Sequence, residues 1–218
     1  IHERADSPLD LIRVACYVNQ MPAAIEMVED AKKKGYEVSC NIMAVSTAQE
    51  GDVRVALEML GHSPVDVIYI VDSFGALYPE QIARIATLYK EYADKYGKKL
   101  GIHAHNNQQL AFANTIEAVG DNVDWLDATY SGMGRGAGNC SMENLLGFLH
   151  NPKYSLYPAL QFVEKHILPL KAEGIVWGYD LQYLVTGLLN QHPRMAIAFT
   201  GDKRNDYAEF YNEMMAQE

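Results

Sequence analysis

The chain has 218 residues, 49% of them hydrophobic, and its 28 Asp and Glu outnumber its 18 Lys and Arg, for a net charge of -10. This composition can bury a sizeable core without any apolar run suited to a membrane, and the negative charge excludes nucleic acid as an expected partner. The three cysteines are few and odd in number, which is typical of a reducing compartment, and the charged first ten residues do not resemble a signal peptide. We therefore expect a cytoplasmic protein.

Short apolar segments alternate with amphipathic segments up to about residue 150, which is typical of repeated βα units with a parallel sheet. The pattern predicts strands at 11–16, 36–43, 65–71, 99–104 and 124–129. It predicts helices at 20–34, 49–60, 78–95, 107–119 and 141–149. Periodicity alone leaves open whether the strands form an open doubly wound sheet or part of a closed barrel.

The pattern changes after residue 150 to proline-marked segments without strong strands. Further helices are predicted at about 158–170, 178–190 and 203–216. We expect two regions, a βα region at 1–150 and a helical extension at 151–218 that serves as a lid or an assembly surface.

Two histidines, His103 and His105, stand two residues apart at the end of a predicted strand, so their side chains should point to the same face. Their imidazoles can then converge on one divalent ion, although histidines alone do not select the metal. Gly101, before them in the strand, is expected to leave the interior roomy. Two hydrogen-bonded histidines without an ion are the alternative, and the pairing on one strand face favours the metal.

A glycine-rich run, GMGRGAGN at 132–139, directly follows the last predicted strand. Alternating glycines let the backbone come close to a ligand. The run satisfies G-x-G-x-x-A, but no strand ending in an acidic residue follows, which argues against a dinucleotide site, and no Gly-Lys-Ser/Thr closes a P-loop. Arg135 and Asn139 place polar groups at the mouth of the sheet. Asn139 or Ser141 could instead cap the helix at 141–149.

Two acidic residues are also candidates. Asp72 ends a predicted strand in VDSFG, where carboxylates of α/β enzymes often serve chemistry, and it could equally be the N-cap or turn residue before the next helix. Asp127 lies in an otherwise apolar predicted strand, where we expect structural pairing with a basic side chain.

Taken together, HAHNN after one strand, LDAT in the next and then GMGRGAGNCSMENLL resemble the metal-dependent aldolase and lyase superfamily, the hydroxymethylglutaryl-CoA lyase-like enzymes on a TIM barrel. The resemblance extends from about residue 11 to 149, and its loop is most similar to the 4-hydroxy-2-oxovalerate aldolase branch. It implies an α/β fold, a (β/α)8 TIM barrel that here lacks about its first three strands, with a C-terminal helical extension.

The resemblance also implies a site and a reaction. His103, His105 and Asn139 would be the metal ligands, and Asp72 and Arg135 would orient the substrate or move protons. The cofactor would be a divalent metal, with Mn or Mg preferred and Zn or Co as alternatives, and no other cofactor is expected. The reaction would be carbon–carbon bond cleavage or formation on a 2-oxo acid through a metal-bound enolate, in which the ion acts as a Lewis acid.

The chain departs from the family pattern at both ends. No strand carries the family's Arg-Asp pair, which completes the metal site and stabilises the enolate, so we expect missing chain upstream, without which the protein could be inactive. WGYDLQY at 177–183 and NQHPRMAIA at 190–198 are unlike the segment with which the hydroxyoxovalerate enzyme docks a dehydrogenase.

Two other functions stay open. One is a Claisen-type acyltransferase resembling the isopropylmalate synthases, and the other is a non-catalytic barrel remnant. The expected partner is a small-molecule 2-oxo acid, with no nucleic acid and no membrane, and a homo-oligomer is an open alternative.

Overall fold

The computed structural model describes residues 1–216, which divide into two units, each with its own internal packing. Unit 1 comprises Ile1–Asp72, Glu80–His103 and Glu117–Leu126. Unit 2 comprises Ser73–Pro79, Ala104–Ile116 and the chain from Asp127 onward. The strands and their flanking helices therefore dominate unit 1, and the segments that follow the strands, with the C-terminal helices, make up unit 2.

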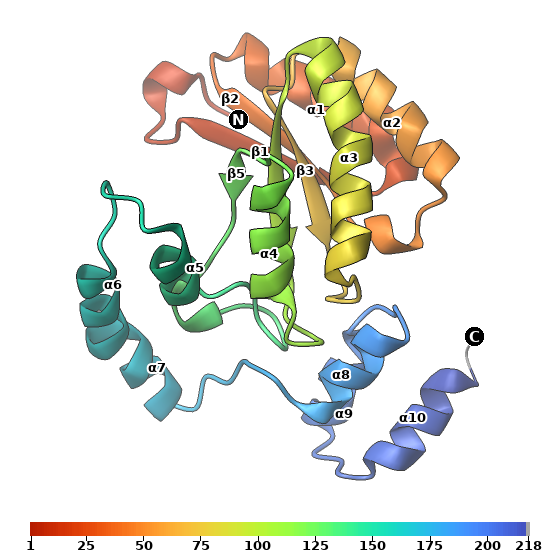
Figure 1. The fold of residues 1–218 in the computed structure, drawn as a ribbon, viewed down its shortest axis with the longest axis vertical. Coiled ribbons are helices and arrows are strands. Elements are labelled where there is room, and N and C mark those ends of the chain that lie inside the picture. The colour runs from red at the N-terminus through yellow and green to blue at the C-terminus, as the bar shows by residue number, and fades with distance from the viewer. Residues whose placement is uncertain (217–218) are drawn as a thin grey trace. The chain divides into compact units, whose positions relative to one another are not determined.

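A five-stranded sheet runs in chain order from edge to edge (Figure 1). The strands are β1 (Leu11–Cys16), β2 (Glu37–Ile42), β3 (Val67–Asp72), β4 (Lys99–Ala104) and β5 (Trp125–Leu126). The pairs β1 with β2, β2 with β3, and β4 with β5 are parallel. All five predicted strands are present, but β5 is only two residues long and ends before Asp127, so the expectation that Asp127 lies within a strand is wrong.

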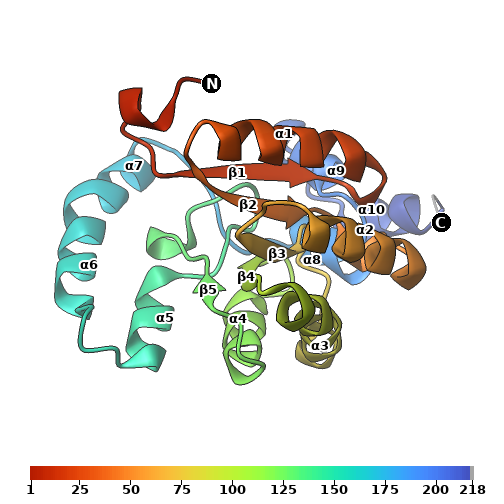
Figure 2. The same ribbon diagram turned by 90° about the horizontal axis from the view of Figure 1, so that it is seen from above.

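Helices alternate with the strands, as the amphipathic spacing predicts. They are α1 (Met21–Lys33), α2 (Glu50–His62), α3 (Pro79–Tyr96) and α4 (Ala111–Gly120). Figure 2 shows α1 and α2 on one side of β1, β2 and β3, and the apolar face of α1 is buried through side chains such as Val28. The lysines in the last turn of α1 complement the negative end of its dipole, and Gly35 beyond it has a φ of 87°.

The strand β3 is buried on both faces, which explains its nearly continuous apolar sequence, VIYIVD. Gly101 in β4 does not leave an open interior, contrary to expectation, because a Cβ there would lie 2.4 Å from the ring of Tyr69. The ring of Tyr69 is covered in turn by the guanidinium of Arg13, 4.2 Å from its centroid. The missing side chain of Gly101 therefore makes room for an aromatic ring.

The remaining helices belong to unit 2. They are α5 (Met142–Leu149), α6 (Leu156–Phe162), a π-helical turn (Val163–Ile167), α7 (Leu168–Ala172), α8 (Leu181–Leu188), α9 (Arg194–Gly201) and α10 (Tyr207–Met215). The predicted helix at 158–170 is interrupted by the π-helical turn just before Pro169, whose ring cannot donate a backbone hydrogen bond. The helix α9 was not predicted, and it begins directly after Pro193.

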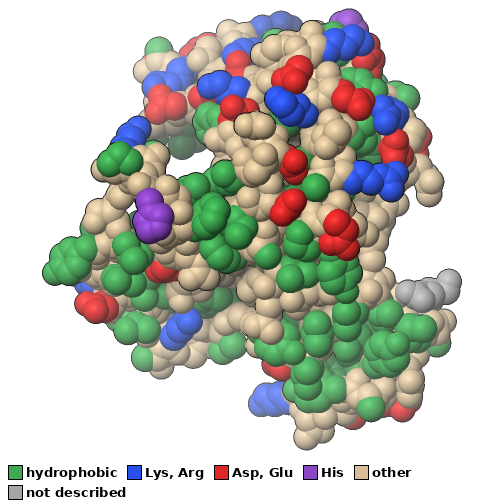
Figure 3. Space-filling model, viewed as in Figure 1, with side chains coloured by type: hydrophobic (Ala, Val, Ile, Leu, Met, Phe, Trp, Pro, Cys, Tyr) green, Lys and Arg blue, Asp and Glu red, His purple; other side chains and the backbone are tan. Residues whose placement is uncertain are grey.

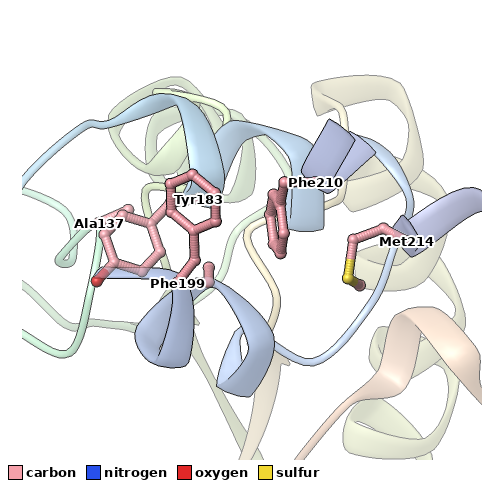
Figure 4. Close-up of a cluster of buried hydrophobic side chains, with 6 residues drawn as sticks. Ala137, Tyr183, Phe199, Phe210 and Met214 are labelled. Carbon is pink, nitrogen blue, oxygen red and sulfur yellow. The ribbon is translucent and has the colours of Figure 1, made fainter. Parts of the chain in front are cut away.

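The helices α8, α9 and α10 share a small hydrophobic core of their own (Figure 4). The rings of Phe199 and Phe210 lie 4.7 Å apart, and Tyr183, Met214 and Ala137 pack around them. Figure 3 shows hydrophobic side chains gathered on the outer surface over α8 to α10. Among residues 1–216, no helix has the length and hydrophobicity that crossing a bilayer requires.

Candidate active site

The paired histidines lie at the end of β4, as predicted. His103 is inside the strand and belongs to unit 1, and His105 is one residue beyond the strand and belongs to unit 2; both are half-buried. The backbone of His105 forms an antiparallel bridge with Asn139. Of the residues proposed from the sequence, His105, Arg135 and Asn139 share unit 2, whereas Asp72 and His103 lie in unit 1.

The glycine run 132–139 forms a hydrogen-bonded loop attached to the segment that follows β4. The amide of Asn106 donates to the carbonyl of Gly138 at 2.9 Å, and the amide of Cys140 donates to the carbonyl of Ala104 at 3.3 Å. Gly138 has a φ of 84°, and a Cβ on Gly134 would lie 2.7 Å from the side-chain amide of Asn139. The glycines therefore permit a close backbone approach that fixes Asn139 next to His105.

The side chain of Asn139 is held at one end only. Its Nδ2 donates to the carbonyl of Met133 at 3.1 Å, whereas its Oδ1 is buried and has no hydrogen-bond partner among the described residues. A buried acceptor without a donor costs about 1–3 kcal/mol. Asn139 does not cap α5; that role falls to Ser141, whose Oγ accepts from the amide of Asn144 at 3.3 Å.

Carbonyl oxygens and imidazole nitrogens are both established ligands for divalent ions. The Oδ1 of Asn139 has no donor among the described residues, and the backbone of Asn139 is bridged to that of His105, so an amide oxygen and an imidazole from these two segments fit a divalent metal. Among residues 1–216, no group of three His, Cys, Asp or Glu side chains could hold an ion by itself. A metal here would consequently rely on the amide oxygen as well as on histidines.

Arg135 and Asp72 occupy different environments. Arg135 is exposed, and its Nη2 donates to the backbone carbonyl of Ser73 at 3.2 Å. Asp72 is fully buried as the last residue of β3. It is not the N-cap of the next helix, because α3 begins only at Pro79.

Cys140 lies between Asn139 and Ser141 in the same loop. It is buried, and desolvation raises the pKa of its thiol. The thiol is therefore protonated at neutral pH and is not activated as a nucleophile.

A pocket of about 340 Å³ opens within unit 2 beside Asn139. Asn106 and Ser141 line it from the strand-end segments, and Lys171 and Trp177 line it from the C-terminal part of the chain. Lys171 is held by Ser131, to whose Oγ its Nζ donates at 3.2 Å. The pocket is polar and carries a cationic group, which suits a small anionic ligand.

Sequence reasoning missed Asn107, which anchors the C-terminal helices. Its side chain is buried, and its Nδ2 donates to the carbonyl of Tyr183 at 3.3 Å and to Oγ1 of Thr186 at 3.4 Å. The sequence offered only its place in HAHNN as a signal, since its partners lie 76 and 79 residues away.

The strand order and the loop geometry can now be compared with those of known proteins. Residues 16–165 match the family model described as HMGL-like, so the chain belongs to the HMGL-like family. It is 34% identical over 176 residues to a 4-hydroxy-2-oxovalerate aldolase of Thermus thermophilus, covering 78% of this chain and 50% of that protein. It is 33% identical over 141 residues to an oxaloacetate decarboxylase of Mycobacterium tuberculosis, covering 65% of this chain and 41% of that protein.

Solved structures agree on the fold. The N-terminal domain of a putative aldolase from Bacteroides vulgatus matches with a TM-score of 0.75 and 29% identity, over 88% of this chain and 64% of that one. The HMG-CoA lyase of Bacillus subtilis matches with a TM-score of 0.62 and 15% identity, over 76% of this chain and 64% of that one, which shows the fold alone. The chain is thus an α/β protein, part of a TIM barrel with a helical extension, as expected. It spans about half the length of the two curated relatives described above.

Proposed function

We propose that the protein is a divalent-metal-dependent aldolase, a carbon–carbon lyase that acts on a 2-oxo acid, with His103, His105 and Asn139 as its metal ligands. The observation that carries the proposal is the buried Oδ1 of Asn139, which has no hydrogen-bond partner among residues 1–216, on a residue whose backbone is bridged to that of His105. Because the chain spans about half of its curated relatives, the proposal concerns the whole protein that contains these residues.

The metal would supply one element of the chemistry, polarisation of the substrate's 2-oxo group as a Lewis acid. Mn or Mg is preferred, and the two imidazoles leave Zn and Co as alternatives. Exposed Arg135 would bind the substrate carboxylate, giving local positive charge to a chain with a net charge of -10. Buried Asp72 would orient the substrate or move a proton.

The substrate class rests on the relatives. Several are named 4-hydroxy-2-oxovalerate aldolase, and one of these from Bacillus cereus is 28% identical over 220 residues, or 94% of this chain and 63% of that protein. In a 4-hydroxy-2-oxo acid, a base takes the proton of the 4-hydroxyl group, the C4–O bond becomes the carbonyl of the leaving aldehyde, and the electron pair of the broken C3–C4 bond passes into the enolate of pyruvate. The enolate then takes a proton to give pyruvate.

A second candidate is decarboxylation of oxaloacetate, favoured by the 33% identity to the mycobacterial oxaloacetate decarboxylase. The same C3–C4 bond breaks and the same pyruvate enolate forms, but carbon dioxide leaves instead of an aldehyde. One arrangement of ligands and carboxylate-binding groups serves both reactions, and the leaving group distinguishes them.

The test incubates the intact protein and Mn²⁺ with 4-hydroxy-2-oxovalerate or with oxaloacetate, and follows pyruvate with lactate dehydrogenase and NADH. Pyruvate formation that EDTA abolishes supports the proposal, and the preferred substrate selects between aldolase and decarboxylase. His105→Ala is the matched control for the spontaneous, Mn²⁺-promoted decay of oxaloacetate.

Two outcomes contradict the proposal. Consumption of acetyl-CoA with a 2-oxo acid would identify a Claisen-type acyltransferase. Failure to bind Mn, Mg, Co or Zn, together with no turnover, would identify a non-catalytic member of the family.

A further inference from the structure

The C-terminal helix α8 is packed onto the segments that follow the strands of the sheet. A Cβ on Gly187 would lie 2.9 Å from Cβ of Asn107 and 3.2 Å from the carbonyl of Gly75. A Cβ on Gly136, next to Arg135, would lie 2.7 Å from the ring of Tyr183. The segment that follows α8 is therefore held beside the loops that carry Ser73 to Gly75 and Arg135.

That segment contains a histidine, His192, with a fixed orientation. Its ring meets the buried ring of Phe74 edge to face, with the centroids 5.6 Å apart. Its Nδ1 accepts a hydrogen bond from the amide of Arg194 at 3.1 Å. Because Nδ1 is an acceptor, the neutral ring carries its proton on Nε2.

The Nε2–H group has no hydrogen-bond partner within residues 1–216. Partial burial lowers the pKa of His192 from its ordinary value, and the positive charges of Arg135 and Arg194 lower the pKa further. At neutral pH the ring is therefore an uncharged donor close to a cation.

Arg135 has no ion-pair partner among the described residues, and its only hydrogen bond there is to the carbonyl of Ser73. Arg135 contacts Ser73 and His192 contacts the adjacent Phe74, so the guanidinium and the unused N–H donor lie along the same short segment. This arrangement suits an anion with more than one acceptor oxygen. A carboxylate has that shape and charge.

We propose that His192 is a further substrate-binding residue, which donates its Nε2–H to the carboxylate of the 2-oxo acid alongside Arg135. This inference rests on the proposed function, because it takes its ligand from that function. It gives the C-terminal segment a direct part in the site. His192 acts as a donor and not as a base, since its free nitrogen already carries the proton.

The test measures the binding of pyruvate to the intact protein in the presence of Mn²⁺ by isothermal titration calorimetry. His192→Phe keeps a ring against Phe74 and removes the donor, and it should weaken binding about tenfold or more, the effect of losing one hydrogen bond to a charged group. His192→Gln places an amide N–H near the position of Nε2 and should restore most of the affinity. In turnover, His192→Phe should raise KM more than it lowers kcat.

The matched control is His166→Gln. His166 is another histidine of the C-terminal part, with its ring tilted against that of Phe162 and the ring centroids 4.8 Å apart. The His166→Gln variant should bind pyruvate as the wild type does. Circular dichroism and the melting temperature of each variant separate loss of the donor from loss of folding.

The outcomes distinguish this inference from the proposed function. Wild-type affinity in His192→Phe, or equal weakening in His192→Phe and His192→Gln in folded proteins, overturns the inference. Absence of pyruvate binding by the wild type overturns it as well. Absence of metal-dependent cleavage, with pyruvate binding that still depends on His192, overturns the proposed function alone.

Discussion

The backbones of His105 and Asn139 face each other in an antiparallel bridge, although the two residues are 34 positions apart in the sequence. The bridge joins the segment after β4 to the glycine loop after β5 and holds the backbones of these two residues side by side. In a site built on these two segments, the backbone bridge fixes the relative position of the two residues. The contribution of each residue to ligand affinity can therefore be tested by substitution.

Metal binding should stabilise the protein. An ion that binds only the folded state adds about 2.7 kcal/mol when its concentration is 100 times its Kd. We therefore expect Mn²⁺ to raise the melting temperature of the wild type and to have little effect on a His103→Ala and His105→Ala double variant. Differential scanning calorimetry with and without EDTA measures both, and an equal rise in the two proteins would argue against these ligands.

Gly187 should tolerate no side chain, although it lies inside a helix, where alanine is normally favoured. In Gly187→Ala the new methyl group would press on Asn107 and Gln108, at 2.9 and 3.1 Å, and should cost about 1–3 kcal/mol. The matched control is Gly147→Ala in α5, where a Cβ meets nothing within 4 Å and the helix should gain about 0.5–1 kcal/mol. Urea unfolding of both variants reports the opposite signs, and two shifts of the same sign would contradict the packing described here.

Phe210 should carry much of the stability of the C-terminal core. It is 1% exposed, and Phe210→Ala should lower the free energy of unfolding by about 3–5 kcal/mol through the cavity that it leaves. Its neighbour Tyr211 is 41% exposed, and Tyr211→Ala should change stability by about 0.5 kcal/mol or less. Hydrogen exchange of the α8 to α10 amides should rise in the first variant only.

The pKa of His192 should respond to Arg135. Burial, Arg135 and Arg194 all lower it, so Arg135→Gln should move this pKa upward, toward the ordinary value. The folded state binds fewer protons than the unfolded state at this group, so its contribution to stability is present above the ordinary histidine pKa and is lost as the pH falls through the lowered one. A histidine-selective NMR titration measures the shift, with Arg204→Gln as the control, since Arg204 instead pairs with Asp206 and Glu213. If the pKa of His192 were the same in the Arg135→Gln variant as in the wild type, the two groups would not interact.

The elements with strong local signals could be predicted from the sequence. The strand β4 was predicted with the bounds that it has, and β1 likewise, because a buried parallel strand requires a compact apolar run. The strand β5 is shorter than predicted, since an apolar run does not reveal how many residues find a partner strand. The helix α9 was missed because the Pro193 that precedes it resembles a break as much as a helix start.

The candidate site divides in the same way. His103 and His105 stand out because of their residue type and their place at the end of a strand, and Asn139 stands out because it closes the glycine run. The side chain of Asn107 contacts a residue 76 positions further along the chain, and the ring of His192 packs against Phe74. No local sequence pattern encodes such long-range contacts. The packing of the Tyr69 ring against Gly101 could not be predicted either, because a glycine in a strand does not reveal which neighbouring group occupies the volume that a side chain would take.

Asn107 has a consequence for biosynthesis. Among the described residues, the acceptors of its buried amide are on α8, so a nascent chain that has not yet produced Thr186 lacks them. A chain that ended near residue 150 would lack both acceptors, and water would have to take their place at the side chain of Asn107.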